Sequence, residues 1–458
     1  MRGRRSAPAA GRRVRVPAPT RDHGVMSQPV TPDVPSDPTG SATGTPPESA
    51  PEAPAVTPLT EPADGIPRVV DTPAAFARVV EAFAAGTGPV AADAERASGY
   101  RYGQATYLVQ VRRAGAGTAL IDPVGVPDMS ALSEAVGDAE WVLHAASQDL
   151  PGFGEHGLRP ARVFDTELAA RLLGMERVGL AAVVAEVLGL GLAKEHSAVD
   201  WSTRPLPEDW LRYAALDVEV LVELRDRLAE RLEAAGKAGW AAQEFEAVRT
   251  APPPPPRQDP WRRTSGMHVL RDRRRIAVVR SLWLARDENA RRRDVAPGRV
   301  LPDRAIVAAA KALPRTVPEL TALREFAGKM TKRRAPQWQA AIDAALRLPE
   351  SELPSSRGPS TDAPPPPRAW ADRDPGAAAR LEAARDVVQR VSEERSTPVE
   401  NLLQPDALRR LCWTPPDPAD AAGVDAFLAG RGARPWQRDL LVEPLVTALR
   451  ATPASPGA

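Results

Sequence analysis

Cysteine is almost absent from this chain, which has one cysteine, Cys412, among its 458 residues. A single cysteine excludes an intramolecular disulfide and a zinc site built from cysteine ligands, and it fits a reducing cytoplasm. Long hydrophobic runs are missing too, because no apolar run approaches the roughly 20 residues that a membrane-spanning helix requires. We therefore expect a soluble, cytoplasmic protein without a membrane partner, and no feature predicts a protein partner.

Proline is abundant, at 50 of 458 residues, and is concentrated in a few runs. A chain of this length is too long for a single core, so we expect the proline runs to separate two to four domains. Residues 1–66 are rich in Pro, Thr, Ser, Ala and Gly without an apolar period, which predicts a disordered tail. Its basic start resembles a transit peptide, but its prolines would break an amphipathic helix, and translation from Met26 is an alternative.

Two proline-rich segments divide the remaining residues. Pro252 to Pro256 form an uninterrupted run, which is a stiff spacer, and a second proline-rich segment covers 354–367. The predicted order is an α/β domain at 67–250, a linker at 251–262, an all-α domain at 263–350, a linker at 351–375 and a second all-α domain at 376–452.

The first domain shows the pattern of a mixed sheet flanked by helices. Short apolar runs predict strands at 69–70, 89–95, 105–112, 118–122, 141–145 and 163–164. Helices are expected at 72–84, 129–136, after Asp149, and at 165–173, 179–189 and 207–235. The three successive strands between 89 and 122 predict an antiparallel meander that opens an α/β domain.

Four acidic residues and one tyrosine of this domain can form a single site. Asp93 and Glu95 are two apart on a predicted buried strand, so they point to the same face and can share a metal ion. Tyr213 and Asp217 are four apart on a predicted helix and also share a face. Asp149 lies where a strand-like run passes into a helix. Because the hard ions Mg²⁺ and Mn²⁺ prefer carboxylate oxygen, this is the minimum set that could hold two such ions against a phosphodiester.

The order of these residues resembles the DEDD 3′-5′ exonucleases, in the branch that has a tyrosine in the third motif. The resemblance narrows to the ribonuclease D family through two runs, His144-Ala-Ala-Ser-Gln-Asp149-Leu150 and Lys194-Glu-His-Ser-Ala-Val-Asp-Trp201-Ser-Thr-Arg204-Pro-Leu206. It covers about residues 67–235 and implies a ribonuclease H-like fold. One departure is Arg96, which follows Glu95 where the family often has an aromatic residue.

The resemblance also implies a role for each residue of the site. Asp93 would bridge two divalent ions. Glu95 and Asp217 would hold the ion that activates water, and Asp149 would help to fix the other ion through bound water. Tyr213 would orient the attacking water towards the phosphorus.

Other polar residues of the domain have weaker indications. Family position suggests Gln104, Lys194 and Arg204 as contacts with the scissile strand, and the alternative for each is a solvated face. His144 is interpreted as a structural residue that orients its loop. Asp165 is interpreted as a helix N-cap, because an aspartate at a helix start accepts backbone N–H hydrogen bonds.

Basic charge is concentrated in the second domain. Residues 257–350 contain 22 Lys and Arg against 10 Asp and Glu, a net charge of +12, whereas the whole chain carries +1. Helices are expected at 271–292, 303–313, 317–323 and 335–348. The segment resembles the HRDC module, which RecQ helicases share with ribonuclease D, through the run Leu282-Trp-Leu-Ala-Arg286. Residues 381–408 repeat the same order of features in degenerate form, which predicts a second HRDC-like domain.

Together with the resemblance to the ribonuclease D family, these observations predict a metal-dependent 3′-5′ exoribonuclease that trims tRNA precursors or other small structured RNAs. A 3′-5′ DNA exonuclease is the alternative among enzymes, because DNA exonucleases share the four acids. The chain has no Walker A loop, which argues against a helicase fusion. A nucleic-acid-binding scaffold with an inactive exonuclease domain would need a lost ligand, and none of the four acids is missing.

Overall fold

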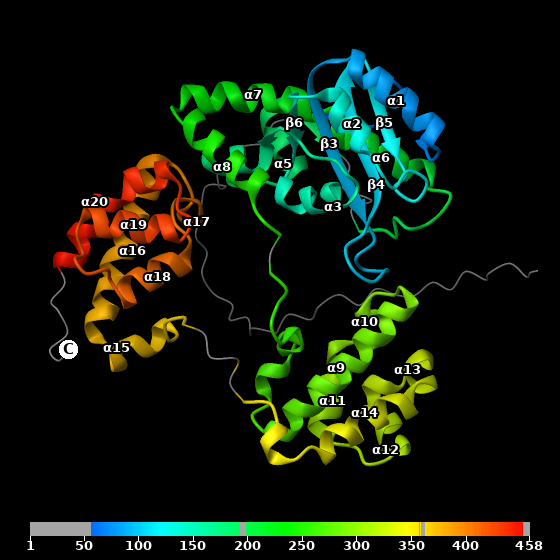
Figure 1. Cartoon of the computed structure of the whole chain (residues 1–458), viewed down its shortest axis with the longest axis vertical. Helices are drawn as coiled ribbons and strands as arrows, with labels where there is room; N and C mark the ends of the chain where they lie inside the picture. Colours follow the sequence, from blue (N-terminus) through cyan, green and yellow to red (C-terminus); the bar gives the residue numbers. More distant parts are fainter. Residues whose placement is uncertain (1–55, 193–197, 254, 357, 359–361, 452–458) are drawn as a thin grey trace, which may run out of the picture. The chain divides into compact units, whose positions relative to one another are not determined.

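The computed structural model describes residues 56–451 apart from 193–197, 254, 357 and 359–361. Residues 1–55 of the predicted tail and Lys194 therefore lie outside the described part of the chain. Among the described helices, none has the length and apolar character needed to cross a lipid bilayer. An α/β domain is followed along the chain by two all-α regions (Figure 1), which confirms the predicted fold class.

The α/β domain is built on a six-stranded sheet with the strand order β2-β5-β4-β3-β6-β7. Its strands are β2 Val69–Val70, β3 Thr87–Arg96, β4 Thr106–Ala114, β5 Gly117–Ile121, β6 Glu140–Leu143 and β7 Arg162–Asp165. β3, β4 and β5 form the predicted antiparallel meander, and the other three pairs are parallel. β3 therefore has a strand on each side, which places its residues in the centre of the domain.

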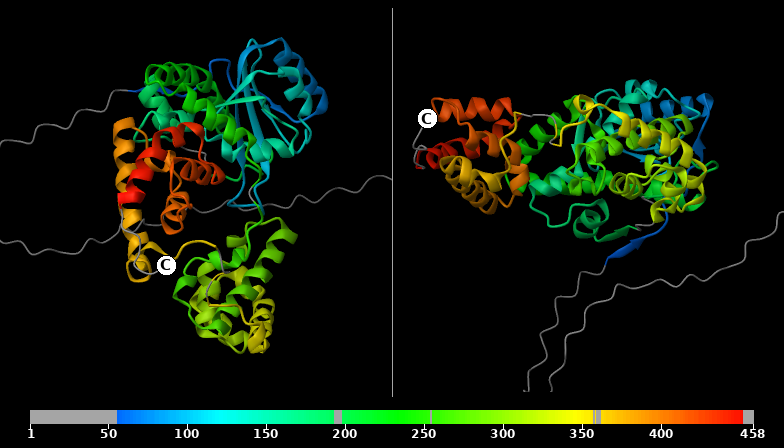
Figure 2. Two further views of the ribbon diagram at one scale, coloured as in Figure 1. Left: turned by 60° about the vertical axis from the view of Figure 1, so that its left-hand side comes forward. Right: turned by 90° about the horizontal axis from the view of Figure 1, so that it is seen from below.

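Side chains of β3 alternate between the two faces of the sheet, as strand geometry requires. Val90, Ala92 and Ala94 pack in a core with buried residues of α1 Pro73–Ala85 and α2 Ser130–Val136. Ala91 packs on the opposite face, in a core with residues of α4 to α7. Figure 2 shows the sheet between these two helical layers. Asp93 and Glu95 share the face of Ala91, because they follow it at intervals of two.

The helices after β6 differ from the prediction in two places. They are η1 Ala146–Gln148, α3 Leu150–Glu155, α4 Thr166–Leu172, α5 Leu180–Leu188, α6 Glu208–Glu219, α7 Leu221–Ala234 and α8 Ala238–Thr250. The helix predicted at 207–235 is two helices, α6 and α7, which are separated at Val220. α8 was not predicted, and its buried residues are only Ala241, Glu244 and Phe245, so its apolar pattern is weak.

Residues 56–66 are ordered, so the predicted disordered tail is wrong for this segment. β1 Thr57–Leu59 pairs in parallel with β8 Leu190–Leu192. Glu61 forms an ion pair with Arg212 of α6 at 3.0 Å. The prediction failed because it used composition alone. The contacts that order this segment come from distant parts of the chain, which composition does not reveal.

The first all-α region contains the expected helices and several short ones. They are η2 Pro260–Arg263, η3 Met267–Val269, α9 Arg273–Arg293, α10 Pro297–Val300, α11 Asp303–Ala312, α12 Val317–Ala322, η4 Arg324–Phe326, α13 Lys329–Arg333, α14 Ala335–Arg347 and η5 Glu350–Glu352. The core of this region includes Ile276, Leu282, Ile306 and Trp338. These residues come from α9, α11 and α14, so the three longest helices share one core.

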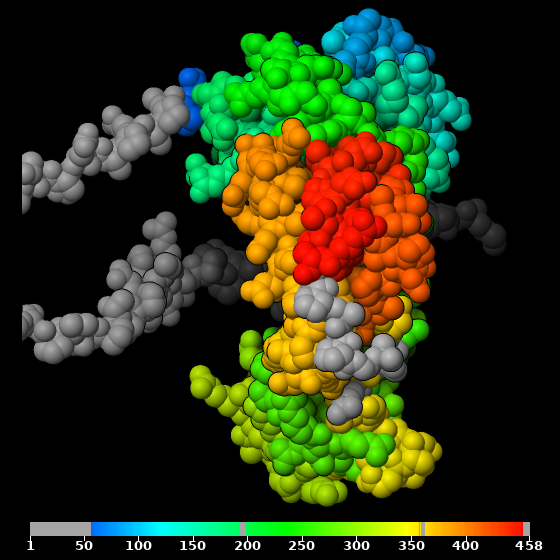
Figure 3. Space-filling view, turned by 90° about the vertical axis from the view of Figure 1, so that its left-hand side faces the viewer, coloured from blue at the N-terminus to red at the C-terminus, as the bar shows by residue number. Residues whose placement is uncertain are grey.

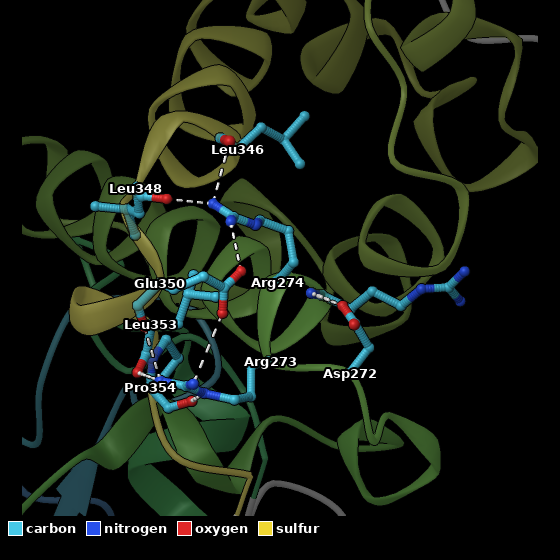
Figure 4. Close-up of polar contacts among 9 residues, drawn as sticks. Asp272, Arg273, Arg274, Leu346, Leu348, Glu350, Leu353 and Pro354 are labelled. Carbon is cyan, nitrogen blue, oxygen red and sulfur yellow. Dashed lines mark hydrogen bonds and ion pairs between the residues drawn. The ribbon is translucent and has the colours of Figure 1, made fainter.

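Two arginines at the start of α9 bind the end of α14 and the segment that follows it (Figure 4). Arg274 donates hydrogen bonds to the carbonyl oxygens of Leu346 and Leu348 and pairs with Glu350 at 3.0 Å. Arg273 donates to the carbonyl oxygen of Leu353 at 2.8 Å. Because the last carbonyl groups of a helix lack intrahelical partners, these contacts stabilise the fold. Arg273 and Arg274 therefore contribute to structure and are not simply free positive charges.

The second all-α region, drawn in orange to red in Figure 3, is a packed bundle. Its helices are η6 Pro367–Ala369, α15 Trp370–Arg373, α16 Pro375–Arg395, α17 Val399–Leu402, α18 Pro405–Trp413, α19 Ala421–Gly430 and α20 Pro435–Ala451. Cys412 is buried in α18, and burial raises the pKa of its thiol to about 12. The cysteine is therefore a core residue and not a reactive thiol at neutral pH.

Candidate active site

A cavity of about 620 Å³ is lined by residues of β3, α6 and the turn after β6. Its lining includes all five residues that the sequence predicted as the catalytic site: Asp93, Glu95, Asp149, Tyr213 and Asp217. The structure thus brings together groups from three separate segments. The roles that the resemblance implies for them stay predictions.

Asp93, Glu95 and Asp217 form the tightest group in this cavity. One carboxylate oxygen of each lies within 4.8 Å of the others. β3 supplies the first two residues, and α6, which packs against β3, β4 and β5, supplies Asp217. Glu95 and Asp217 are only 9% and 7% exposed, so these carboxylates are largely removed from water.

Asp149 lies on the turn that connects β6 with α3, at the predicted changeover from strand to helix. Ala145 in this turn has a φ of +61°, in the left-handed region that non-glycine residues rarely adopt. The backbone N–H groups of Ala145 and Ala146 donate to the Asp165 carboxylate at 3.1 and 2.8 Å. Asp165 therefore holds the turn that carries Asp149, in addition to capping α4 as predicted. The sequence indicated the cap but not this second contact.

His144 lies at the same turn and bonds the Thr166 hydroxyl through Nδ1 at 2.8 Å. Burial lowers the pKa of His144 to about 4, so the imidazole is neutral at physiological pH. A neutral, hydrogen-bonded histidine fits the interpretation of His144 as a structural residue.

The Tyr213 ring packs against Trp201, with ring centroids 6.4 Å apart. Trp201 is completely buried and also contacts Trp210 of α6 at a centroid distance of 5.4 Å. These contacts fix the position of α6. The Tyr213 hydroxyl forms a hydrogen bond with Asp217, and burial together with the nearby carboxylates raises the pKa of Tyr213. The phenol therefore stays protonated at neutral pH.

The structure separates the residues that were predicted to contact the substrate. Gln104 lines the cavity, and its Oε1 accepts a hydrogen bond from Ser98 at 2.7 Å. Arg204 does not line the cavity. Its guanidinium donates to both carboxylate oxygens of Asp122, at 2.6 and 2.8 Å, and to the Tyr107 carbonyl oxygen at 2.8 Å. Arg204 thus has a structural role, because its donors are used within the protein.

The donor set of the cavity fits a divalent metal ion. Burial is the largest cause that raises the pKa of each of the four acids. Repulsion from Asp93 raises the pKa of Glu95, Asp149 and Asp217 further. Closely spaced carboxylates with excess negative charge are the oxygen ligands that Mg²⁺ and Mn²⁺ prefer. Asp93, Glu95 and Asp217 are therefore the residues that would hold an ion.

Three family models match this chain. They are described as 3′-5′ exonuclease, at residues 67–233, as HRDC domain, at 275–342, and as 3′ to 5′ exonuclease C-terminal domain, at 363–449. The region predicted as a second HRDC-like domain thus matches a model with a different description.

Ribonuclease D of Nitrobacter hamburgensis (strain DSM 10229) is 30% identical over 312 residues, which cover 66% of this chain and 74% of that protein. The chain belongs to the ribonuclease D family. It spans a smaller share, 55% and 64%, of two other ribonuclease D relatives.

Solved structures agree with membership of the ribonuclease D family. A protein from Bifidobacterium adolescentis is 43% identical with a TM-score of 0.79, and the match covers 86% of this chain and all of that one. Escherichia coli ribonuclease D is 27% identical with a TM-score of 0.59, over 84% of this chain and 99% of that one.

The raised pKa values predict how the metal-free protein responds to pH. An acid whose pKa is higher in the folded state destabilises the fold once the pH exceeds its unfolded value of about 4. In EDTA, the acidic cluster should therefore lower the Tm as the pH rises from about 4 towards the pKa of Asp149, which burial raises to about 8. Burial and the neighbouring acids raise the pKa of Glu95 to about 10, so folding must protonate this carboxyl group at neutral pH. Glu95→Gln removes that requirement, so this variant should melt higher than the wild type, by about 2 to 4 °C per kcal/mol.

The quantity to compare is the difference in Tm between the wild type and Glu95→Gln, because it cancels the effect of His144. Titration of His144 changes the stability of both proteins with pH in the direction opposite to that of the acids. The pKa of His144 is lowered by burial, so its contribution to stability is lost as the pH falls. The Tm difference should grow with pH, and Mg²⁺ should stabilise the wild type more than the variant at alkaline pH. Equal melting of both proteins in EDTA throughout this range would contradict the prediction.

Proposed function

We propose that this member of the ribonuclease D family is a divalent-metal-dependent 3′-to-5′ exoribonuclease, which hydrolyses phosphodiester bonds at RNA 3′ ends. The observation that carries the proposal is the group of Asp93, Glu95 and Asp217, whose carboxylate oxygens lie within 4.8 Å of one another. Asp149 lines the same cavity. We expect two ions, Mg²⁺ or Mn²⁺, with Asp93 shared between them and Asp149 contributing to the second.

When bound, two such ions would activate water and stabilise charge on the attacking and leaving oxygens. The protein's own groups would position the reactants. Tyr213 stays protonated because burial and nearby carboxylates raise its pKa, so its hydroxyl can donate to the attacking water but cannot act as the base. Asp165 holds the turn of Asp149, and Trp201 holds the helix of Asp217.

We propose RNA as the substrate class because of the similarity to ribonuclease D relatives. Escherichia coli ribonuclease D, which is similar in structure to this chain, is described as an exoribonuclease involved in structured RNA processing. We extend this substrate class to the present chain and propose tRNA precursors or other small structured RNAs. The net charge of +12 in residues 257–350 is consistent with a polyanionic ligand.

The two all-α regions differ in charge, which indicates where structured RNA would bind. Residues 257–350 have a net charge of +12, whereas residues 376–452 contain 10 Arg and Lys against 11 Asp and Glu, a net of −1. In the basic region, Arg273 and Arg274 bind backbone carbonyls. Arg291 and Arg292 at the other end of α9 are more than 60% exposed. We propose that this end of α9 contacts RNA phosphates.

The first prediction tests the catalytic assignment. Asp217→Asn keeps the shape of the side chain but removes a charge that should hold a divalent ion, so nearly all exonuclease activity should be lost while the fold is kept. Asp209→Asn, an exposed acid on the same helix outside the cavity, is the matched control and should retain activity. The measurement is degradation of 5′-labelled RNA and DNA of equal sequence, with Mg²⁺ or Mn²⁺.

Each outcome of this assay decides between the candidate functions. Faster hydrolysis of DNA than of RNA would favour the DNA exonuclease, and no hydrolysis by the folded wild type would favour a binding scaffold. Turnover of Asp217→Asn within a few-fold of the wild type would contradict the assignment of Asp217 as a metal ligand.

Tyr213→Phe separates orientation of water from metal binding. The substitution removes only the hydroxyl, so turnover should fall by roughly 10- to 1000-fold, the scale of a positioned catalytic group. Mn²⁺ affinity, measured by calorimetry, should stay near the wild-type value. Tyr107→Phe on β4 is the control, because Tyr107 does not line the cavity. A collapse of Mn²⁺ affinity in Tyr213→Phe would show that Tyr213 is structural.

The basic end of α9 gives a prediction about RNA binding. Replacing Arg291, Arg292 and Arg293 with Gln should weaken binding of a tRNA-like RNA and make it less dependent on salt. Each lost phosphate contact should reduce the logarithmic salt slope by about 0.7 to 0.9. The matched control replaces Arg385, Arg390 and Arg395 of α16, which removes the same charge from the region without net positive charge. Equal affinities and slopes in both variants would exclude α9 as a specific RNA anchor.

A further inference from the structure

Arg96, the last residue of β3, brings a positive charge into the acidic cavity. Among the described residues that line the cavity, it is the single Lys or Arg. The regular pairing of β3 with β4 ends here, because a register shift lies between Glu95 and Arg96. The Arg96 side chain reaches across to the turn after β6, whereas the preceding acid Glu95 stays with Asp93 and Asp217.

The guanidinium of Arg96 binds Asp149 through one oxygen only. Nη1 and Nη2 both donate to Asp149 Oδ1, at 3.0 and 2.7 Å, and Nη1 also donates to the Gln148 carbonyl oxygen at 3.1 Å. No described residue donates a hydrogen bond to Asp149 Oδ2. An arginine that engages both oxygens of a carboxylate in parallel is the stronger arrangement, so this contact is the weaker of the two kinds. Separating Arg96 from Asp149 therefore does not break a bidentate arginine–carboxylate pair.

The other three acids of the cavity differ from Asp149 in this respect. Within the described chain, Asp93, Glu95 and Asp217 have no Lys or Arg at ion-pair distance, whereas Asp149 and Arg96 are 5% and 19% exposed at the side chain and directly paired. The cation that accompanies Asp149 is thus a side chain of the protein itself. A metal ion at Asp149 would compete with that side chain.

We propose that Arg96 is a positioning residue that pairs with Asp149 and must release it before Asp149 can help to hold the second divalent ion. The proposal rests on the two-ion function proposed above. A phosphate group of the substrate offers the released guanidinium another anionic partner, since arginine binds phosphate and carboxylate alike. Arrival of the RNA strand and use of Asp149 as a ligand are therefore coupled through Arg96.

Calorimetric titration of the full chain with Mn²⁺, in the absence of RNA, tests this coupling. Arg96→Met keeps the aliphatic stem and removes the charge, so the weaker Mn²⁺ binding step should strengthen by about tenfold or more, a change that corresponds to at least about 1.4 kcal/mol. The stronger step should change little. Arg96→Lys keeps a charge but loses the planar guanidinium, and should lie between the two proteins.

Arg112→Met is the matched control. Arg112 on β4 also pairs with an aspartate, Asp64, at 2.7 Å, but outside this cavity. Both Mn²⁺ binding steps should match those of the wild type. Melting in EDTA provides a second readout: Arg96→Met leaves Asp149 buried without its partner and should lower the Tm, and Mn²⁺ should restore it.

Adenosine 5′-monophosphate serves as a probe for the phosphate partner. It should strengthen the weaker Mn²⁺ step of the wild type and have a smaller effect on Arg96→Met. The proposed role of Arg96 would be overturned, without affecting the proposed metal dependence, by either of two results. One is a weaker Mn²⁺ step that Arg96→Met leaves unchanged or weakens further, and the other is a single Mn²⁺ ion bound by both proteins. No Mn²⁺ binding by the folded wild type would overturn the proposed metal-dependent function as well.

Discussion

The carboxylates of Asp93, Glu95 and Asp217 lie within 4.8 Å of one another, with Glu95 and Asp217 buried and Asp93 half-buried, although each charge would be more stable in water. Folding the metal-free chain therefore concentrates negative charge that must be protonated, paired with a cation or neutralised by a metal ion. Burial raises the pKa of each of the four acids, and repulsion from Asp93 adds to it for the other three. Asp149 is in addition paired with a cation, Arg96. The surrounding fold must supply the free energy that holds these residues in place.

Packing around the site supplies this free energy through residues other than the acids themselves. β3 lies between two neighbouring strands and buries alanine and valine on one face, while its acids occupy the other. Trp201 is completely buried against α6, and Asp165 accepts two backbone hydrogen bonds from the turn of Asp149. These contacts explain how acids that repel one another can occupy fixed positions.

Arginine serves two purposes in this chain, and only the structure distinguishes them. Arg204 and Arg274 use their guanidinium groups within the protein, on Asp122 and on the end of α14. Arg291 and Arg292 pair with Glu288 on the same helix, but their side chains remain more than 60% exposed on a region with excess positive charge. A count of basic residues therefore overestimates the charge that an RNA ligand can meet, but it identifies the region that carries it.

The sequence by itself determined the six strands of the main sheet, most helices of the α/β domain, and five of the residues that line its cavity. Local periodicity gives two pairs: Asp93 and Glu95 share a strand face, and Tyr213 and Asp217 share a helix face. The resemblance to the ribonuclease D family joins these pairs with Asp149 into one predicted site. Only the tertiary structure decided that Arg96 pairs with Asp149 and that Arg204 pairs with Asp122. It also decided the second contact of Asp165 and the ordered conformation of residues 56–66. Each of these contacts joins residues that are distant in the sequence, so no local sequence pattern could predict which residues would meet in the fold.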